Sequence, residues 1–198
     1  MRHWVRTITL GTALLAGTAL PASAQQWFAR FSGLTEPTPN TSPGTGFALL
    51  TLTGNFMRVE ASFSGLLGPS TVAHVHCCTA TPGTGAAGVA TPTPSFPGFP
   101  TGVTSGSYDQ TFDLTLASSW NAAFITANGG TTDGARAAYL AGLNQRRAYF
   151  NVHSSTFPGG EINGYLTAVP EPSTYALLGT GLLAVGMIAR RSRGRARV

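Results

Sequence analysis

The stretch Phe47-Ala-Leu-Leu-Thr-Leu-Thr-Gly-Asn-Phe-Met-Arg-Val-Glu-Ala-Ser-Phe63 decides the fold class, because apolar and polar residues alternate in its second half. Four apolar side chains fall on one face of an extended chain and a more polar set falls on the other, which is typical of a half-buried β-strand. Gly54-Asn55 separates this run from another apolar run and favours a tight turn. We therefore predict a β-hairpin over residues 47–63.

The same patterns extend along the chain between residues 25 and 168. We predict further strands at residues 27–31, 72–78, 106–116, 147–153 and 161–167. Two short helices are expected at residues 120–127 and 134–145, each preceded by residues that cap helices. The long Pro- and Thr-rich loop at residues 79–103 is expected to pack over one end of the β core through Phe96 and Phe99.

The N-terminal 24 residues have the three parts of a secretory signal peptide. Arg2 and Arg6 precede an apolar run from Ile8 to Leu20, and Ala22-Ser23-Ala24 is a small-residue cleavage motif. We predict a signal helix that is removed by signal peptidase after Ala24.

The C-terminal residues 169–198 have the order of a stop-transfer tail. Val169-Pro170-Glu171-Pro172 precedes an apolar run, and five arginines follow Ala189. A transmembrane helix is predicted at about residues 174–189, roughly 24 Å long at 1.5 Å per residue. This order resembles the PEP-CTERM sorting signal of Gram-negative bacteria. The resemblance implies membrane anchoring, with processing near the Pro-Glu-Pro by an exosortase.

The charge of the chain resides in its two ends. The full sequence has 12 basic and 7 acidic residues, a net charge of +5. Residues 25–168 hold only five arginines, no lysine and six acidic residues, a net charge of −1. This central region therefore lacks the basic patch that nucleic-acid binding requires. Its length suits one domain, and its wealth of Gly, Thr, Ser and aromatic residues favours β structure.

His74, His76 and Cys78 alternate along one predicted strand, so their side chains are expected to project from the same face. Imidazole nitrogens and a thiolate at this spacing can share one copper or zinc ion, and His153 adds a further ligand if its strand is the neighbour. The alternative is that the imidazoles only hydrogen-bond to backbone groups. An incomplete catalytic set argues against an enzyme.

Cys77 and Cys78 are the only cysteines of the chain. Export places both thiols in an oxidising compartment, where a disulfide between these neighbours is expected. Adjacent Cα atoms lie closer together than unstrained disulfides prefer. Ligation of a metal by Cys78 and two free thiols are the other interpretations.

Three motifs, in order, resemble the CHRD domain, which is named from chordin. They are Ala73-His-Val-His76, Ala148-Tyr-Phe-Asn-Val-His-Ser154 and Pro158-Gly-Gly-Glu-Ile-Asn-Gly164, and the resemblance extends over residues 27–166. It implies an all-β antiparallel sandwich or barrel, immunoglobulin-like or superoxide-dismutase-like, with one or two short helices. Cys77-Cys78 departs from the Gly-Pro-Ala that many members have after His-x-His.

We therefore expect an exported binding or structural module of the cell envelope or an extracellular matrix. Exopolysaccharide is a possible partner implied by the sorting-tail resemblance. The alternative is a periplasmic or extracellular protein that binds copper or zinc through His74, His76 and His153, with Cys78 as a further candidate ligand. A third hypothesis is a carbohydrate-binding domain that uses Trp120, Tyr108 or Tyr139 as stacking platforms.

Overall fold

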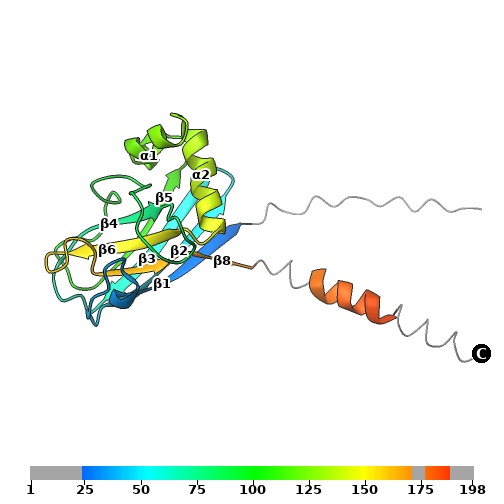
Figure 1. Ribbon diagram of the computed structural model, residues 1–198, viewed down its shortest axis with the longest axis horizontal. Coiled ribbons are helices and arrows are strands. Elements are labelled where there is room, and N and C mark those ends of the chain that lie inside the picture. Colours follow the sequence, from blue (N-terminus) through cyan, green and yellow to red (C-terminus); the bar gives the residue numbers. More distant parts are fainter. Residues whose placement is uncertain (1–23, 171–176, 188–198) are drawn as a thin grey trace, which may run out of the picture.

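The computed structural model describes residues 24–170 and 177–187 of the chain. Eight strands and two α-helices make up the domain (Figure 1). In chain order they are β1 (Gln25–Ser32), β2 (Thr45–Thr53), β3 (Phe56–Ser64), β4 (Ser70–Cys77), β5 (Gly106–Asp113), α1 (Ala122–Ala127), α2 (Thr132–Asn144), β6 (Ala148–Ser154), β7 (Ile162–Tyr165) and β8 (Thr167–Val169). The signal helix predicted before Ala24 lies outside the described residues.

All eight strands belong to one antiparallel sheet that curves into a half-barrel, so the expectation of a mostly β fold is confirmed. The strand order is β4-β6-β7-β1-β2-β3-β5, and β8 also pairs with β1. Within residues 24–170 the strands do not divide into two separate sheets, as they would in a sandwich. The reason is β1, which pairs with β2 along one edge and with β7 and β8 along the other, and so joins both halves of the chain in one hydrogen-bonded ladder.

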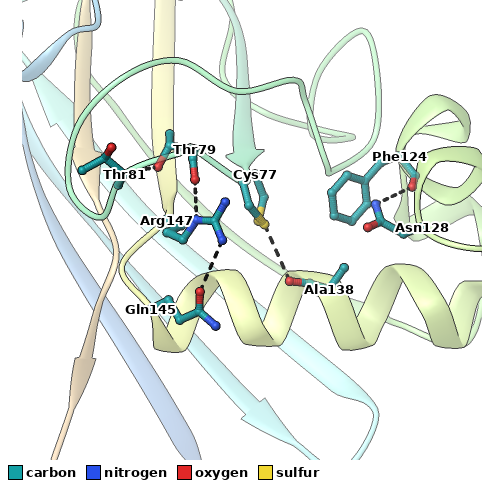
Figure 2. The surroundings of a disulfide bond; sticks show 9 residues. Cys77, Thr79, Thr81, Phe124, Asn128, Ala138, Gln145 and Arg147 are labelled. Atoms are coloured by element: carbon teal, nitrogen blue, oxygen red, sulfur yellow. Dashed lines mark hydrogen bonds between the residues drawn. A yellow bond between two sulfur atoms is a disulfide. The ribbon is translucent and has the colours of Figure 1, made fainter.

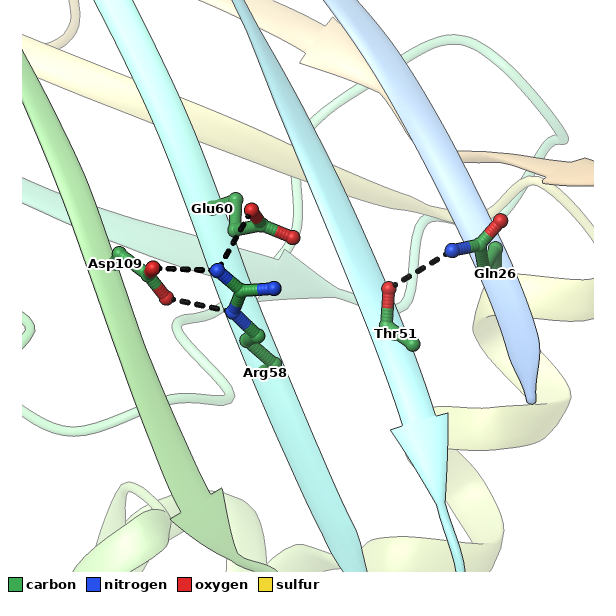
Figure 3. Close-up of polar contacts among 5 residues, drawn as sticks. All are labelled: Gln26, Thr51, Arg58, Glu60 and Asp109. Carbon is green, nitrogen blue, oxygen red and sulfur yellow. Dashed lines mark hydrogen bonds and ion pairs between the residues drawn. The ribbon is translucent and has the colours of Figure 1, made fainter.

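The predicted hairpin forms β2 and β3. Their register pairs Thr53 with Phe56 across the turn, and Gly54 adopts a φ of 61° that favours glycine. Met57, Val59, Ala61 and Phe63 are buried in the core. The predicted alternation is confirmed, because the intervening residues of β3 face outward (Figure 3).

The two helices pack at one end of the half-barrel (Figure 1). α2 begins at Thr132, two residues earlier than predicted, because the Thr131 side chain accepts a hydrogen bond from the Gly134 amide and caps the helix. At its other end, Asn144 accepts a hydrogen bond of 3.1 Å from the Trp27 indole of β1. Trp120, Tyr108 and Tyr139 are buried in the core, so none of them is an exposed platform for a carbohydrate.

A long loop covers the free edge of β4. Backbone hydrogen bonds join Cys77 to Gly88 at 3.0 Å, Ala90 to Val75 at 2.9 Å and Phe96 to Ala73 at 3.1 Å. The predicted packing of this loop is confirmed, since Phe96 and Phe99 are buried in the core. An edge strand covered in this way is protected from pairing with another chain, and the loop also delivers backbone carbonyls to the histidines of β4.

Residues 177–187 of the tail are helical. No helix in the two described segments reaches the combination of length and hydropathy that a membrane crossing requires. The span predicted at residues 174–189 lies partly outside these segments.

Candidate metal centre

Strand register places the motif side chains on one face of β4, β6 and β7. His74 lies opposite Asn151 and His76 lies opposite Tyr149. On the other side of β6, Asn151 and Tyr149 lie opposite Asn163 and Tyr165. His153 follows Asn151 by two residues and shares its face. The Tyr-x-Asn-x-His and His-x-His motifs therefore build one continuous surface.

The three histidines of this surface form a compact cluster. One ring nitrogen of each histidine lies within 4.8 Å of those of the other two. The ring of His74 packs edge-on against His76 and His153, with centroids 5.7 and 5.2 Å away. The structure thus brings His153 to the His-x-His pair, as the metal hypothesis requires.

Each imidazole uses one nitrogen to bind a backbone carbonyl. The pairs are His74 Nε2 with Pro94 O at 2.5 Å, His76 Nδ1 with Ala87 O at 2.8 Å and His153 Nδ1 with Pro158 O at 2.8 Å. A carbonyl can only accept, so in each pair the ring nitrogen donates its proton. The other nitrogens, His74 Nδ1, His76 Nε2 and His153 Nε2, are buried and have no hydrogen-bond partner.

Burial keeps these imidazoles neutral. Desolvation lowers the pKa of His74 and of His153 below the usual 6.5, and it lowers that of His76 to about 4. The hydrogen bonds to backbone carbonyls oppose this change but do not reverse it. At neutral pH each ring therefore keeps a lone pair, which is the state that a metal ion needs.

His76 is held in place by Tyr149. Their rings are parallel within 2°, with centroids 4.7 Å apart, and the Tyr149 hydroxyl accepts a long hydrogen bond of 3.4 Å from the Ala87 amide. His76 also borders a surface cavity of about 590 Å³, together with Glu36 and Asn151. The cavity gives small molecules a route toward the histidine cluster.

Cys78 does not join the histidines, contrary to the expectation that it shares their face. β4 ends at Cys77, so the alternation of side chains does not continue to Cys78. Cys77 and Cys78 are joined to each other by a disulfide, which lies beside α2 at the end of β4 (Figure 2). The sulfur of Cys78 lies 3.6 Å from the Ala138 carbonyl oxygen of α2, and both sulfurs sit against Gly142.

Two polar residues of this region escaped prediction from the sequence. Glu36 is buried, and its carboxylate oxygen Oε2 lies 3.4 Å from the Asn151 amide. Desolvation raises the pKa of Glu36 to about 8, and the bond from Asn151 only partly offsets it. The alternation of Tyr149, Asn151 and His153 is a signal that could have identified Asn151. Glu36 comes from a distant loop and carries no such signal.

Glu161 of the third motif is fully buried. Its Oε1 atom accepts hydrogen bonds of 2.6 Å from both the Leu67 amide and the Ser42 hydroxyl. The carboxylate thereby fixes two loops at one end of the half-barrel.

The residues of the predicted processing sites lie at the margins of the described segments. Ala24 immediately precedes β1, and Val169 ends β8, where it pairs with Gln26. Pro170 follows, whereas Glu171 and Pro172 lie outside the described residues.

Comparison with known proteins agrees with these motifs. A model of the CHRD domain matches residues 27–166, which include most of β1, all of β2 to β7 and the three histidines. The chain belongs to the CHRD domain family. Residues 168–193 match the PEP-CTERM protein-sorting motif, which indicates an exported protein with a membrane-anchored precursor. No curated protein and no solved structure matches the chain.

Proposed function

We propose that this CHRD domain binds one copper or zinc ion through His74, His76 and His153. The observation that carries the proposal is the pairing of fixed and free nitrogens: each ring donates one proton to a backbone carbonyl and leaves one buried nitrogen unpartnered. Metal-bound histidines typically have this second contact, which fixes the tautomer and the ring orientation.

The energetics favour an ion at this position. A buried acceptor without a donor costs about 1–3 kcal/mol, and the three histidines that each carry such a nitrogen lie in one cluster. One cation satisfies all three lone pairs at once. Three neutral imidazoles suit copper and zinc and leave room for a fourth ligand, which can enter from the cavity beside His76.

Metal analysis of the full-length chain, purified without a histidine tag, tests the proposal. We expect about one equivalent of copper or zinc after loading and dialysis. Substituting Ala for any one of the three histidines should abolish stoichiometric binding. A matched control is the double variant Cys77→Ala/Cys78→Ala, which should still bind because neither sulfur belongs to the cluster.

Two results would contradict the metal site. One is less than about a tenth of an equivalent of metal in the folded wild-type protein after loading. The other is metal loss in the cysteine control, which would make Cys78 a ligand. Near-UV circular dichroism of each variant shows whether its fold is intact.

We further propose that the exported domain acts as a binding or structural module at the cell envelope or in an exopolysaccharide matrix. The sorting motif supports an envelope location. The strand register also separates the histidines from the tail. His74 pairs with Asn151, which pairs in turn with Asn163 and so leads to Ser32 at the end of β1. Val169, where the tail begins, pairs with Gln26 at the start of β1. An anchored domain would therefore turn its metal centre away from the tail.

Replacing Pro170, Glu171 and Pro172 with alanine tests the sorting step. We expect the variant to accumulate as a full-length precursor in the membrane fraction, while the wild type is shortened. Equal processing of both proteins on a size gel would falsify the assignment of the motif.

A further inference from the structure

A second cavity shares Glu36, Pro37 and Pro39 with the cavity beside His76. It measures about 550 Å³ and contains none of the histidines. The end of β1, the 34–39 segment, the 83–85 loop and the turn after α2 form its walls. Its lining includes Arg30, Arg146, Leu34, Thr84, Gly85 and Tyr165.

The lining of this cavity carries two positive charges that no acidic side chain neutralises. Within residues 24–170 and 177–187, the only ion pairs are those that Arg58 makes with Glu60 and Asp109. Arg30 lies over the Phe28 ring, with its guanidinium carbon 5.7 Å from the centroid. The only acidic residue in the lining is Glu36, whose raised pKa of about 8 keeps it largely neutral at pH 7.

Arg146 occupies a backbone position where glycine is the usual residue. It follows the C-terminus of α2, where the Arg147 amide donates to Gly142 O at 2.8 Å and the Arg146 amide donates to Leu143 O at 3.1 Å. This pattern is the Schellman motif, which favours glycine at the left-handed position. With a φ of 58°, Arg146 is the one non-glycine residue in the described segments with a positive φ.

Arg146 also lies against the neighbouring loop, through its backbone carbonyl and its guanidinium. Gly83 donates its amide to Arg146 O at 2.7 Å, and a Cβ atom at Gly83 would lie 3.2 Å from the Arg146 guanidinium carbon. A strained residue held in this way suggests that its side chain has a role that glycine cannot fill.

We propose that this cavity binds the carboxylate of a sugar acid through Arg30 and Arg146. Arginine recognises carboxylates through paired hydrogen bonds, and the volume suits a small ligand. The walls beside the arginines are mixed: Thr84 and the loop backbone offer polar groups for hydroxyls, while Leu34, Pro37 and Tyr165 offer apolar contact. This mixture matches a hydroxylated ring with apolar faces better than a bare inorganic anion. The proposal does not depend on the metal centre.

Isothermal titration calorimetry on the full-length protein tests the proposal. Glucuronate, glucose and inorganic phosphate are titrated separately in the presence of EDTA, so that metal ligation cannot contribute. We expect glucuronate to bind, and glucose and phosphate to bind at least about tenfold more weakly. Arg30→Ala and Arg146→Gly should each weaken glucuronate binding by about 10- to 100-fold, the usual value of a hydrogen bond to a charged group.

Arg146→Gly is the informative variant, because glycine suits the left-handed backbone and the protein should remain folded. Arg136→Ala is the matched control: it removes the same charge from α2, where Arg136 donates to Gly54 O at 3.0 Å, away from the cavity lining. It should leave the affinity unchanged.

Three results would overturn the proposal. The first is no glucuronate binding, or equal binding of glucose. The second is equal or tighter binding of phosphate, which would indicate a site for a free oxyanion. The third is an equal loss of affinity in Arg136→Ala, which would indicate a general effect of net charge.

Discussion

The outer surface of the sheet has two regions that differ in how their polar side chains are paired. The first region consists of β4, β6 and β7, and the second consists of β1, β2, β3 and β5. In the second region polar side chains satisfy one another in solvent. Arg58 contacts Asp109 at 2.6 Å and Glu60 at 3.0 Å, and Gln26 donates to Thr51 at 3.2 Å (Figure 3). In the first region Asn151, Asn163 and the histidines are buried or half-buried, and several of their polar atoms have no partner in the described structure.

Loops cause this difference. Both regions have antiparallel pairing and share one apolar core, but loops reach the outer face where the motifs lie. The carbonyls of Pro94, Ala87 and Pro158 there accept hydrogen bonds from the three histidines. Cys77 and Ala73 of β4, for example, are hydrogen-bonded to Gly88 and Phe96 of the covering loop. Covering a polar surface removes water from groups that then need another partner. This difference supports the proposed metal site, because the unpartnered histidine nitrogens lie in the covered region.

The largest effect is expected at the junction of the two regions. Gly164 of β7 lies so close to β1 that a Cβ atom there would overlap the Arg30 carbonyl. Gly164→Ala should therefore destabilise the protein by about 3 kcal/mol or more, because backbone rather than a side chain must move. Urea unfolding measures the change.

Gly159→Ala is the control from the same motif. Its added Cβ meets nothing within 4 Å, so the free energy of unfolding should change by less than about 0.5 kcal/mol. Equal effects of the two substitutions would contradict the close packing of β7 on β1.

The second prediction concerns Glu36, which titrates differently from a carboxyl group in water. Its folded pKa of about 8 lies above the usual 4.5 of a glutamate, so its stabilising contribution is complete below pH 4.5 and disappears as the pH rises through 8. Glu36→Gln cannot ionise. As the pH rises from 5 to 8, the free energy of unfolding of this variant should increase by roughly 2 kcal/mol relative to that of wild type. This is less than the full pKa change would give, because Glu36 borders two cavities where solvent screens its charge.

Unfolding midpoints across this pH range measure that difference. Glu60→Gln, on the open outer surface of β3, should keep the wild-type decline because Glu36 is still present. Parallel pH profiles for Glu36→Gln and wild type would show that Glu36 ionises as it does in water.

The sequence predicted the local part of this architecture well. Alternation in β3 located its buried and exposed faces, and the spacing of His74 and His76 placed both on one surface with His153. Cys78 follows the same spacing but lies elsewhere, because the strand ends one residue before it. Periodicity holds only as far as the regular backbone does, and the end of a strand is the least predictable part of it.

The non-local part could not be predicted. Glu36 meets Asn151, 115 residues away, and Arg30 shares a cavity with Arg146. These neighbours are set by loops whose paths have no periodic signal. The choice between sandwich and half-barrel was equally non-local, since it depends on β1 pairing along both of its edges.

The third prediction addresses the strain at Arg146. A left-handed backbone costs an L-residue about 1–2 kcal/mol relative to glycine. Replacing the residue with glycine removes this cost, but part of the gain in stability is lost because glycine makes the unfolded chain more flexible. Arg146→Gly should therefore stabilise the protein by about 1 kcal/mol in urea unfolding. A destabilised variant would mean that the guanidinium, lying against Gly83, contributes more to stability than the strain costs.

The smallest effect is expected from the ion pairs of the open surface. Arg58 bonds Asp109 through two atoms, yet both side chains are about half exposed and water competes for each. Arg58→Ala should leave the urea midpoint nearly unchanged, and the small remaining difference should disappear at high salt because exposed charges are screened. The ion pair raises the pKa of Arg58 and lowers that of Asp109. Any loss of stability in Arg58→Ala should therefore appear above the usual pKa range of Asp and fade in acid. A large, salt-independent loss would instead show that the open surface is as tightly organised as the covered one, and the contrast between the two regions would no longer hold.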